Sequence, residues 1–79
     1  MKTEYRIGMM HGSTHYVFTV FAPKDVTIEK INQQISQAMV KPINPDWDGT
    51  PEAAVKFACK RNNWEYGETV SLVVPEGFF

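Results

Sequence analysis

Cysteine is almost absent from this 79-residue chain, which contains only Cys59. One cysteine excludes an internal disulfide framework and a cysteine-based zinc cage. No run of apolar residues approaches the roughly 18 that a membrane span requires, and the first residues lack the basic-then-apolar pattern of a secretory leader. We therefore expect a cytoplasmic protein without a membrane segment.

Excess charge of one sign is also absent. Eight basic residues stand against nine acidic ones, for a net charge of -1. No overall attraction to nucleic acid or anionic lipid follows from such a balance. Hydrophobic residues make up 43% of the chain and aromatic residues 13%, which excludes a disordered segment. The length and composition predict one small globular domain over residues 1–79.

Three segments have the pattern of β-strands. Apolar and polar residues alternate over 3–10, β-branched and aromatic residues dominate 15–22, and alternation returns over 68–74. The short turn-forming stretch 11–14 makes the first two strands an antiparallel hairpin. Because segment 15–22 carries apolar residues on both faces, we expect it to be a central strand.

Two helices are predicted between the second and third strands. Thr27 has the features of an N-cap, and the helix that follows ends near Met39 or Val40. Thr50 caps a second helix with Pro51 at its first position, which ends near Asn62. The apolar residues at helical spacing are Ile28, Ile31 and Ile35 in the first helix and Ala54, Phe57 and Ala58 in the second. We expect these six side chains to pack on the sheet.

The predicted fold is α+β: a two-layer β-β-α-α-β domain whose three-stranded, mainly antiparallel sheet is covered by two helices on one face. The strand order is 1-2-3 if the third strand pairs with the second, and 3-1-2 if it pairs with the first. The two-sided second strand favours 1-2-3. The other sheet face would carry Val17 and Phe21, and it becomes a candidate contact surface if solvent reaches it.

The segment after the first helix resembles half of a calcium-binding loop. Asn44, Asp46 and Asp48 occupy its first, third and fifth positions, and Gly49 occupies the sixth. The twelfth position, where a bidentate glutamate is needed, is Val55. We therefore interpret the segment as a turn rich in Asn and Asp that leads into a helix cap, and we predict no metal site.

The same loop is the strongest candidate for binding a partner. Residues 41–49 form the longest connection in the chain, and long ordered loops often carry function. Trp47 is a residue type enriched at interaction hot spots. The alternative, that Trp47 covers the domain's own core, stays open. The predicted partner-binding residues are Asn44, Asp46, Trp47 and Asp48.

The remaining chemistry-bearing residues do not form a recognisable catalytic set. His11 and His15 flank a turn without a third metal ligand. Cys59 lies within a predicted helix, away from its N-terminus, and is interpreted as a small hydrophobic residue. We expect no cofactor and no enzymatic activity.

The function predicted from the sequence is a non-enzymatic protein-interaction module with a protein partner. Its size and style are typical of small accessory or inhibitory proteins of phages and mobile elements, including anti-defence proteins. The alternative is a nucleic-acid-binding accessory protein that uses the second helix, where the cations are Lys56, Lys60 and Arg61.

Overall fold

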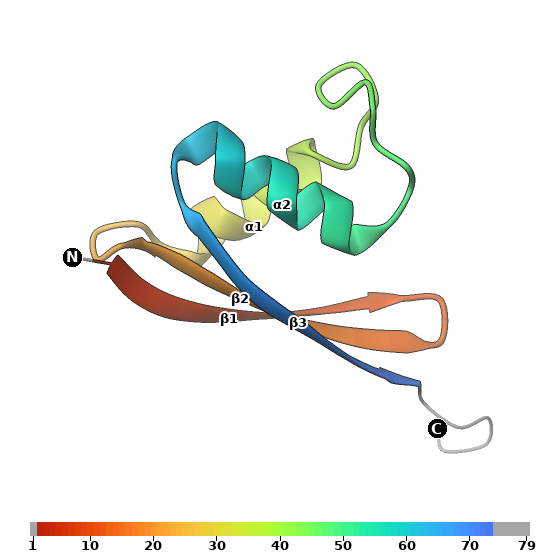
Figure 1. Ribbon diagram of the computed structural model, residues 1–79, viewed down its shortest axis with the longest axis horizontal. Helices are drawn as coiled ribbons and strands as arrows, with labels where there is room; N and C mark the ends of the chain where they lie inside the picture. Colours follow the sequence, from red (N-terminus) through yellow and green to blue (C-terminus); the bar gives the residue numbers. More distant parts are fainter. Residues whose placement is uncertain (1, 74–79) are drawn as a thin grey trace.

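A computed structural model describes residues 2–73 of the chain. The elements in chain order are β1 (Lys2–His11), β2 (Thr14–Pro23), α1 (Ile28–Gln37), α2 (Pro51–Asn62) and β3 (Glu65–Val73). The strands form one antiparallel sheet in the order β1-β2-β3, and both helices lie on one face of it (Figure 1). The predicted α+β arrangement and the strand order 1-2-3 are thereby confirmed.

A two-residue turn joins β1 and β2. Gly12 has φ 64°, whereas Ser13 is not among the residues with positive φ. This is the pattern of a type II′ turn, whose first central position requires glycine. From that turn the pairing runs without a shift, from His11 opposite Thr14 to the far ends of both strands.

Strand β3 begins at Glu65, three residues before the predicted start. The sequence pattern missed these residues because a β-bulge interrupts the alternation: Gly67 and Glu68 together stand opposite Thr19. A Cβ atom on Gly67 would come within 2.9 Å of the Phe21 ring. Glycine therefore lets β3 approach β2 closely at the bulge. Val74, the predicted end of the strand, lies outside the described residues.

Both predicted helix starts are confirmed. The Thr27 hydroxyl accepts from the Lys30 backbone N–H at 3.1 Å, and the Thr50 hydroxyl accepts from that of Ala53 at 3.3 Å. Helix α1 ends at Gln37, before the predicted Met39 or Val40, because the chain leaves the helix in a series of tight turns after its cap.

Helix α2 ends in a Schellman motif. Asn63 adopts the left-handed conformation with φ 57°, and the Trp64 backbone N–H donates to the Cys59 carbonyl at 2.8 Å. Trp64 and Cys59 are both buried, so the motif also closes an apolar contact. The chain therefore passes from the end of α2 directly into β3, which packs against the same helix.

The core lies between the helices and one face of the sheet. Its fully buried large side chains are Phe18, Val20, Ile31, Ile35 and Val55. Of the six side chains expected to pack on the sheet, Ile31, Ile35, Ala54 and Ala58 are buried, and Phe57 is half-buried against the core. On α2, Val55 is also fully buried. The expectation for Ile28 requires correction. Ile28 is 43% exposed, since it lies one turn before the part of α1 whose side chains reach the core.

The helices cover only part of the sheet. Along β2, Phe18, Val20 and Ala22 are fully buried, whereas Tyr16 is half-buried on the same face. Figure 1 shows the hairpin turn projecting beyond both helices. We call this projecting end the overhang. Tyr16 stacks on Phe18 with ring centroids 5.7 Å apart, so the apolar row of the core continues into the overhang.

Candidate functional site

Three of the four predicted partner-binding residues stabilise the chain between α1 and α2. Asn44 is only 5% exposed. Its side-chain Nδ2 donates to the Ala38 carbonyl at 2.9 Å, and its backbone N–H donates to the Val40 carbonyl at 2.9 Å. The residue therefore satisfies carbonyl groups that the end of α1 leaves without helical partners.

Trp47 is half-buried and packs against the core cluster. Its indole Nε1 donates to the Thr50 carbonyl at 2.8 Å, and its backbone N–H donates to the Asn44 carbonyl at 3.1 Å. The indole thus has an apolar contact on one side and a hydrogen bond at its polar edge. Of the two readings left open by the sequence, the structure supports a lid on the core.

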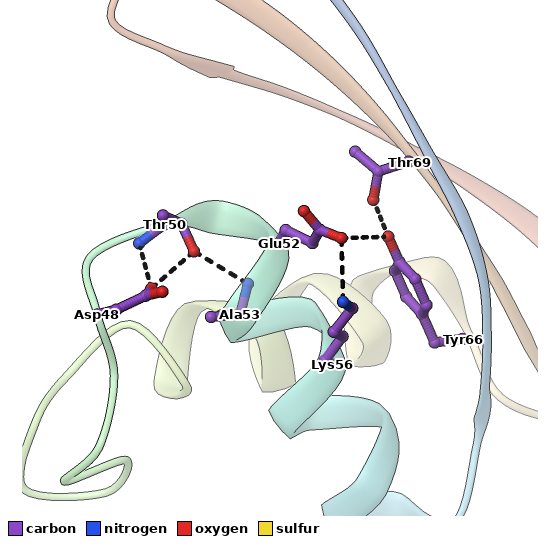
Figure 2. Close-up of polar contacts among 7 residues, drawn as sticks. All are labelled: Asp48, Thr50, Glu52, Ala53, Lys56, Tyr66 and Thr69. Atoms are coloured by element: carbon purple, nitrogen blue, oxygen red, sulfur yellow. Dashed lines mark hydrogen bonds and ion pairs between the residues drawn. The ribbon is translucent and has the colours of Figure 1, made fainter.

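Asp48 caps the start of α2 together with Thr50. Its carboxylate accepts from the Thr50 backbone N–H at 3.0 Å and from the Thr50 hydroxyl at 2.7 Å (Figure 2). These bonds, led by that of the hydroxyl, hold the pKa of the Asp48 carboxyl below its usual value. Asp46 is exposed. Partner binding by this loop stays a prediction. The groups that remain free to contact a partner are Asp46 and the solvent-facing side of Trp47.

The calcium-loop pattern and the two histidines are the features that the sequence raised as metal sites. Val55, at the twelfth position of the calcium-loop pattern, is fully buried in the core. His11 and His15 lie on neighbouring strands beside the hairpin turn, His11 exposed and His15 half-buried. Within residues 2–73, no three His, Cys, Asp or Glu side chains are grouped closely enough to hold a metal ion.

The cations of α2 do not form one uniform stripe. Lys56 Nζ lies 3.1 Å from Glu52 Oε1 and 5.3 Å from the centre of the Tyr66 ring (Figure 2). Its charge is therefore partly compensated on the side of α2 that faces β3. Lys60 and Arg61 are exposed near the end of the helix, where they complement the helix dipole.

One residue of α2, Cys59, and one of β3, Tyr66, have raised pKa values. Burial raises the pKa of the Cys59 thiol to about 11. Burial, and next the nearby Glu52 carboxylate, raises the pKa of Tyr66 to about 12; the Tyr66 hydroxyl also contacts Thr69. Cys59 is thus a protonated thiol at neutral pH, which is a poor nucleophile.

The two helices leave the opposite face of the sheet uncovered (Figure 1), and we call this face the open face. The register places these residues on it: Glu4, Arg6, Gly8 and Met10 of β1, His15, Val17, Thr19 and Phe21 of β2, and Glu65 and Val70 of β3. Val17 stands between Gly8 and Val70, and Val70 is 50% exposed. The apolar residues of this face are Val17, Phe21 and Val70, which we call the apolar strip; Thr19 stands between Val17 and Phe21 along β2, and the His15 ring lies close to Gly8.

Sequence reasoning identified Val17 and Phe21 as contact candidates but missed Val70 and Met10. Met10 stands opposite His15 and is 52% exposed. The signal for Val70 was ambiguous, because both alternating series of β3 carry apolar residues. The bulge at Gly67 and Glu68 decides which series faces solvent, and it depends on pairing with β2.

A charged margin borders the apolar strip. Arg6 Nε lies 3.1 Å from Glu4 Oε2, and both side chains are largely exposed. Their partners in the register are Thr19 and Phe21. The open face therefore combines apolar residues at its centre with an ion pair at the β1 edge and the exposed Glu65 at the β3 edge.

No protein-family model matches the chain, and no significant match to it was found among curated proteins or solved structures. Within residues 2–73, neither helix has the length and apolar character needed to cross a bilayer.

Proposed function

We propose that the chain is a non-enzymatic protein-binding module that contacts its partner through the open face. The observation that carries the proposal is the apolar strip of Val17, Phe21 and Val70, extended by Met10 toward the hairpin turn. Removing exposed apolar surface from water is favourable, and apolar groups gathered on one face are a common feature of interaction sites.

The chemistry of the open face indicates what would bind there. An apolar centre with a polar rim is the usual anatomy of a protein interface. The Glu4–Arg6 pair at the rim adds orientation more than affinity, because exposed ion pairs contribute little. The partner is therefore expected to present an apolar patch of similar size with polar surroundings.

A small protein that covers part of another protein's surface can act as its inhibitor. The inhibitory or accessory role in phages and mobile elements belongs to this proposal and is supported by the size and style of the chain alone. The loop around Asp46 and Trp47 is a secondary contact in the proposal, since it lies on the helix side of the molecule (Figure 1).

The test uses one charged substitution on each side of the molecule. Val70→Lys places a charge on the open face, and Val40→Lys places the same charge at a valine that is 46% exposed after α1. Both variants are checked for unchanged circular dichroism and are then used with the wild-type chain to capture proteins from host extract.

We expect wild type and Val40→Lys to retain the same protein and Val70→Lys to lose it. The purified partner should then bind Val70→Lys at least about tenfold more weakly, because a buried unpaired charge is costly. Equal binding by Val70→Lys would contradict the proposal. The proposal would also be contradicted if the chain retained only nucleic acid and lost it with Lys60→Glu and Arg61→Glu. That result would favour the alternative function.

A further inference from the structure

The two edge strands of the sheet, β1 and β3, differ in how readily they could pair with a further strand. Strand β1 pairs with β2 over ten residues with no bulge and no proline. Strand β3 contains the bulge at Gly67 and Glu68, and Glu65 and Glu68 give it acidic side chains only among Glu65–Val73. Bulges and charges of one sign protect an edge from a second copy. By this comparison β1 is the open edge.

The hairpin turn determines which backbone groups of β1 face that edge. A two-residue turn closes on a hydrogen-bonded pair, here His11 and Thr14. Because such pairs alternate along an antiparallel ladder, the odd-numbered residues of β1 direct their N–H and C=O groups to β2. The even-numbered residues direct theirs to the free edge. Those residues are Lys2, Glu4, Arg6, Gly8 and Met10.

The same even-numbered residues carry charges that alternate in sign: Lys2, then Glu4, then Arg6. A strand with charges of one sign would repel its own copy in every register. An alternating strand attracts its copy in some registers and repels it in others, because opposed charges on neighbouring strands stabilise and like charges destabilise.

We infer that a second copy of this chain pairs antiparallel along the β1 edge, about a two-fold axis that passes between the Tyr5 residues of the two copies. In this register Glu4 stands opposite Arg6 of the second copy, and Arg6 stands opposite its Glu4. Gly8 stands opposite Lys2 of the second copy, so no like charges meet.

The neighbouring registers lack this complementarity. A shift by two residues in one direction places Glu4 opposite Glu4 of the second copy and Arg6 opposite Lys2. A shift in the other direction places Arg6 opposite Arg6. Odd shifts are excluded, since they would oppose an edge-facing residue with one whose backbone groups already pair with β2.

The dimer would contain one six-stranded sheet. A two-fold axis perpendicular to the sheet keeps both helical layers on one side and joins the two open faces on the other. The inference is independent of the proposed function, because it needs no other protein. Glu4 and Arg6 also border the apolar strip, but the dimer depends on the edge of β1 and the proposed function on the strip, so each can fail alone.

The first experiment measures the oligomeric state by sedimentation. An interface made by one strand from each copy is small and therefore weak. The wild-type chain should be monomeric at about 5 µM and largely dimeric at about 0.5 mM. Glu4→Arg and Arg6→Glu each place like charges together and should weaken the dimer at least about tenfold. The double variant with both changes restores opposite pairs and should dimerise again. The control is Lys30→Glu, which makes the same change of charge as Arg6→Glu at an exposed residue of α1.

The second experiment locates the interface by amide hydrogen exchange. In dilute protein, the amides of Tyr5 and Ile7 should exchange slowly and those of Glu4, Arg6 and Gly8 fast. In concentrated protein, the latter three should become protected. A wild-type monomer at about 0.5 mM would overturn the inference. So would a dimer that both single variants leave intact, or protection that appears elsewhere on the chain.

Discussion

The position of Trp47 makes the removal of its side chain the most informative single change in the loop. The indole packs on the core and bonds through Nε1 to the Thr50 carbonyl at 2.8 Å. Thr50 in turn caps α2. Trp47→Ala therefore removes an apolar lid and a hydrogen bond beside the start of a helix, and we expect it to lower the free energy of unfolding.

The magnitude follows from the burial of the side chain. A fully buried tryptophan replaced by alanine costs about 3–5 kcal/mol, and Trp47 is half-buried, so its apolar part accounts for about 2 kcal/mol. The hydrogen bond to Thr50 adds about 1 kcal/mol. Trp47→Phe keeps most of the apolar contact and should cost only about 1 kcal/mol. For a domain of this length, a loss of about 2–3 kcal/mol lowers the melting temperature by roughly 10 °C or more.

The assay is thermal and urea unfolding followed by far-UV circular dichroism, which does not depend on the tryptophan removed. Val40→Ala is the matched control, since Val40 is an apolar residue of the same connection that solvent reaches freely; its effect should stay within about 0.5 kcal/mol. A Trp47→Ala variant that unfolds together with wild type would refute the lid assignment and return Trp47 to the surface-hot-spot hypothesis.

Three further experiments test a hydrogen bond between the helices, the pH dependence of stability and the absence of calcium binding. Asn62 Nδ2 donates to Gln34 Oε1 at 3.0 Å between the helices, so a double-mutant cycle with Asn62→Ala and Gln34→Ala should give a coupling of about 0.5–1.5 kcal/mol in urea unfolding, and additive losses would contradict the contact. The raised pKa of Cys59, about 11 against 9.0, means that folding favours the protonated thiol: this stability is complete below pH 9 and is lost as the pH rises through 11. Cys59→Ala should reduce this loss of stability at high pH, and a pH profile equal to that of wild type would contradict the role given to the thiol. Calcium at about 1 mM should leave the melting temperature unchanged, because Val55 replaces the bidentate glutamate; a rise of several degrees would show a site.

The features that the sequence predicted correctly are those with local causes. Thr27 and Thr50 precede apolar or proline-led helical segments, and the cap geometry needs only residues within three positions of them. Gly12 occupies the one turn position that requires positive φ. The helix end that was predicted near Asn62 is followed at once by Asn63, a residue type that tolerates the left-handed conformation. Each of these signals acts within a single turn of chain.

The features that it missed depend on contacts between distant segments. The bulge in β3 forms because Gly67 can approach Thr19 and Phe21 closely, and those residues lie more than 40 positions away. The buried face of α2 is set by how the helix lies on β2 and β3, and small residues on several sides of it allowed more than one orientation. Ala54, Val55 and Ala58 define the face that the packing selects.

The loop shows why a sequence-based site prediction can select structural residues. Asn44, Trp47 and Asp48 are polar or aromatic residues in a long connection, which is also the composition of a binding loop. Here the side chains of Asn44 and Asp48 accept or donate hydrogen bonds at the ends of the two helices. A connection that must leave one helix and start another needs such groups whether or not it binds anything.

The open face and the overhang have the same physical origin. Two short helices cover only the part of β2 from Phe18 to Ala22, yet the strands continue toward the hairpin turn with apolar residues on both faces. A sheet that served the core alone would end where the helices end, or would carry polar residues beyond that point, because exposed apolar surface stabilises nothing in the monomer. Tyr16 and Val17 stand on opposite faces in that projecting segment. A further surface would bury both side chains, and this is the physical argument that supports the proposed binding function.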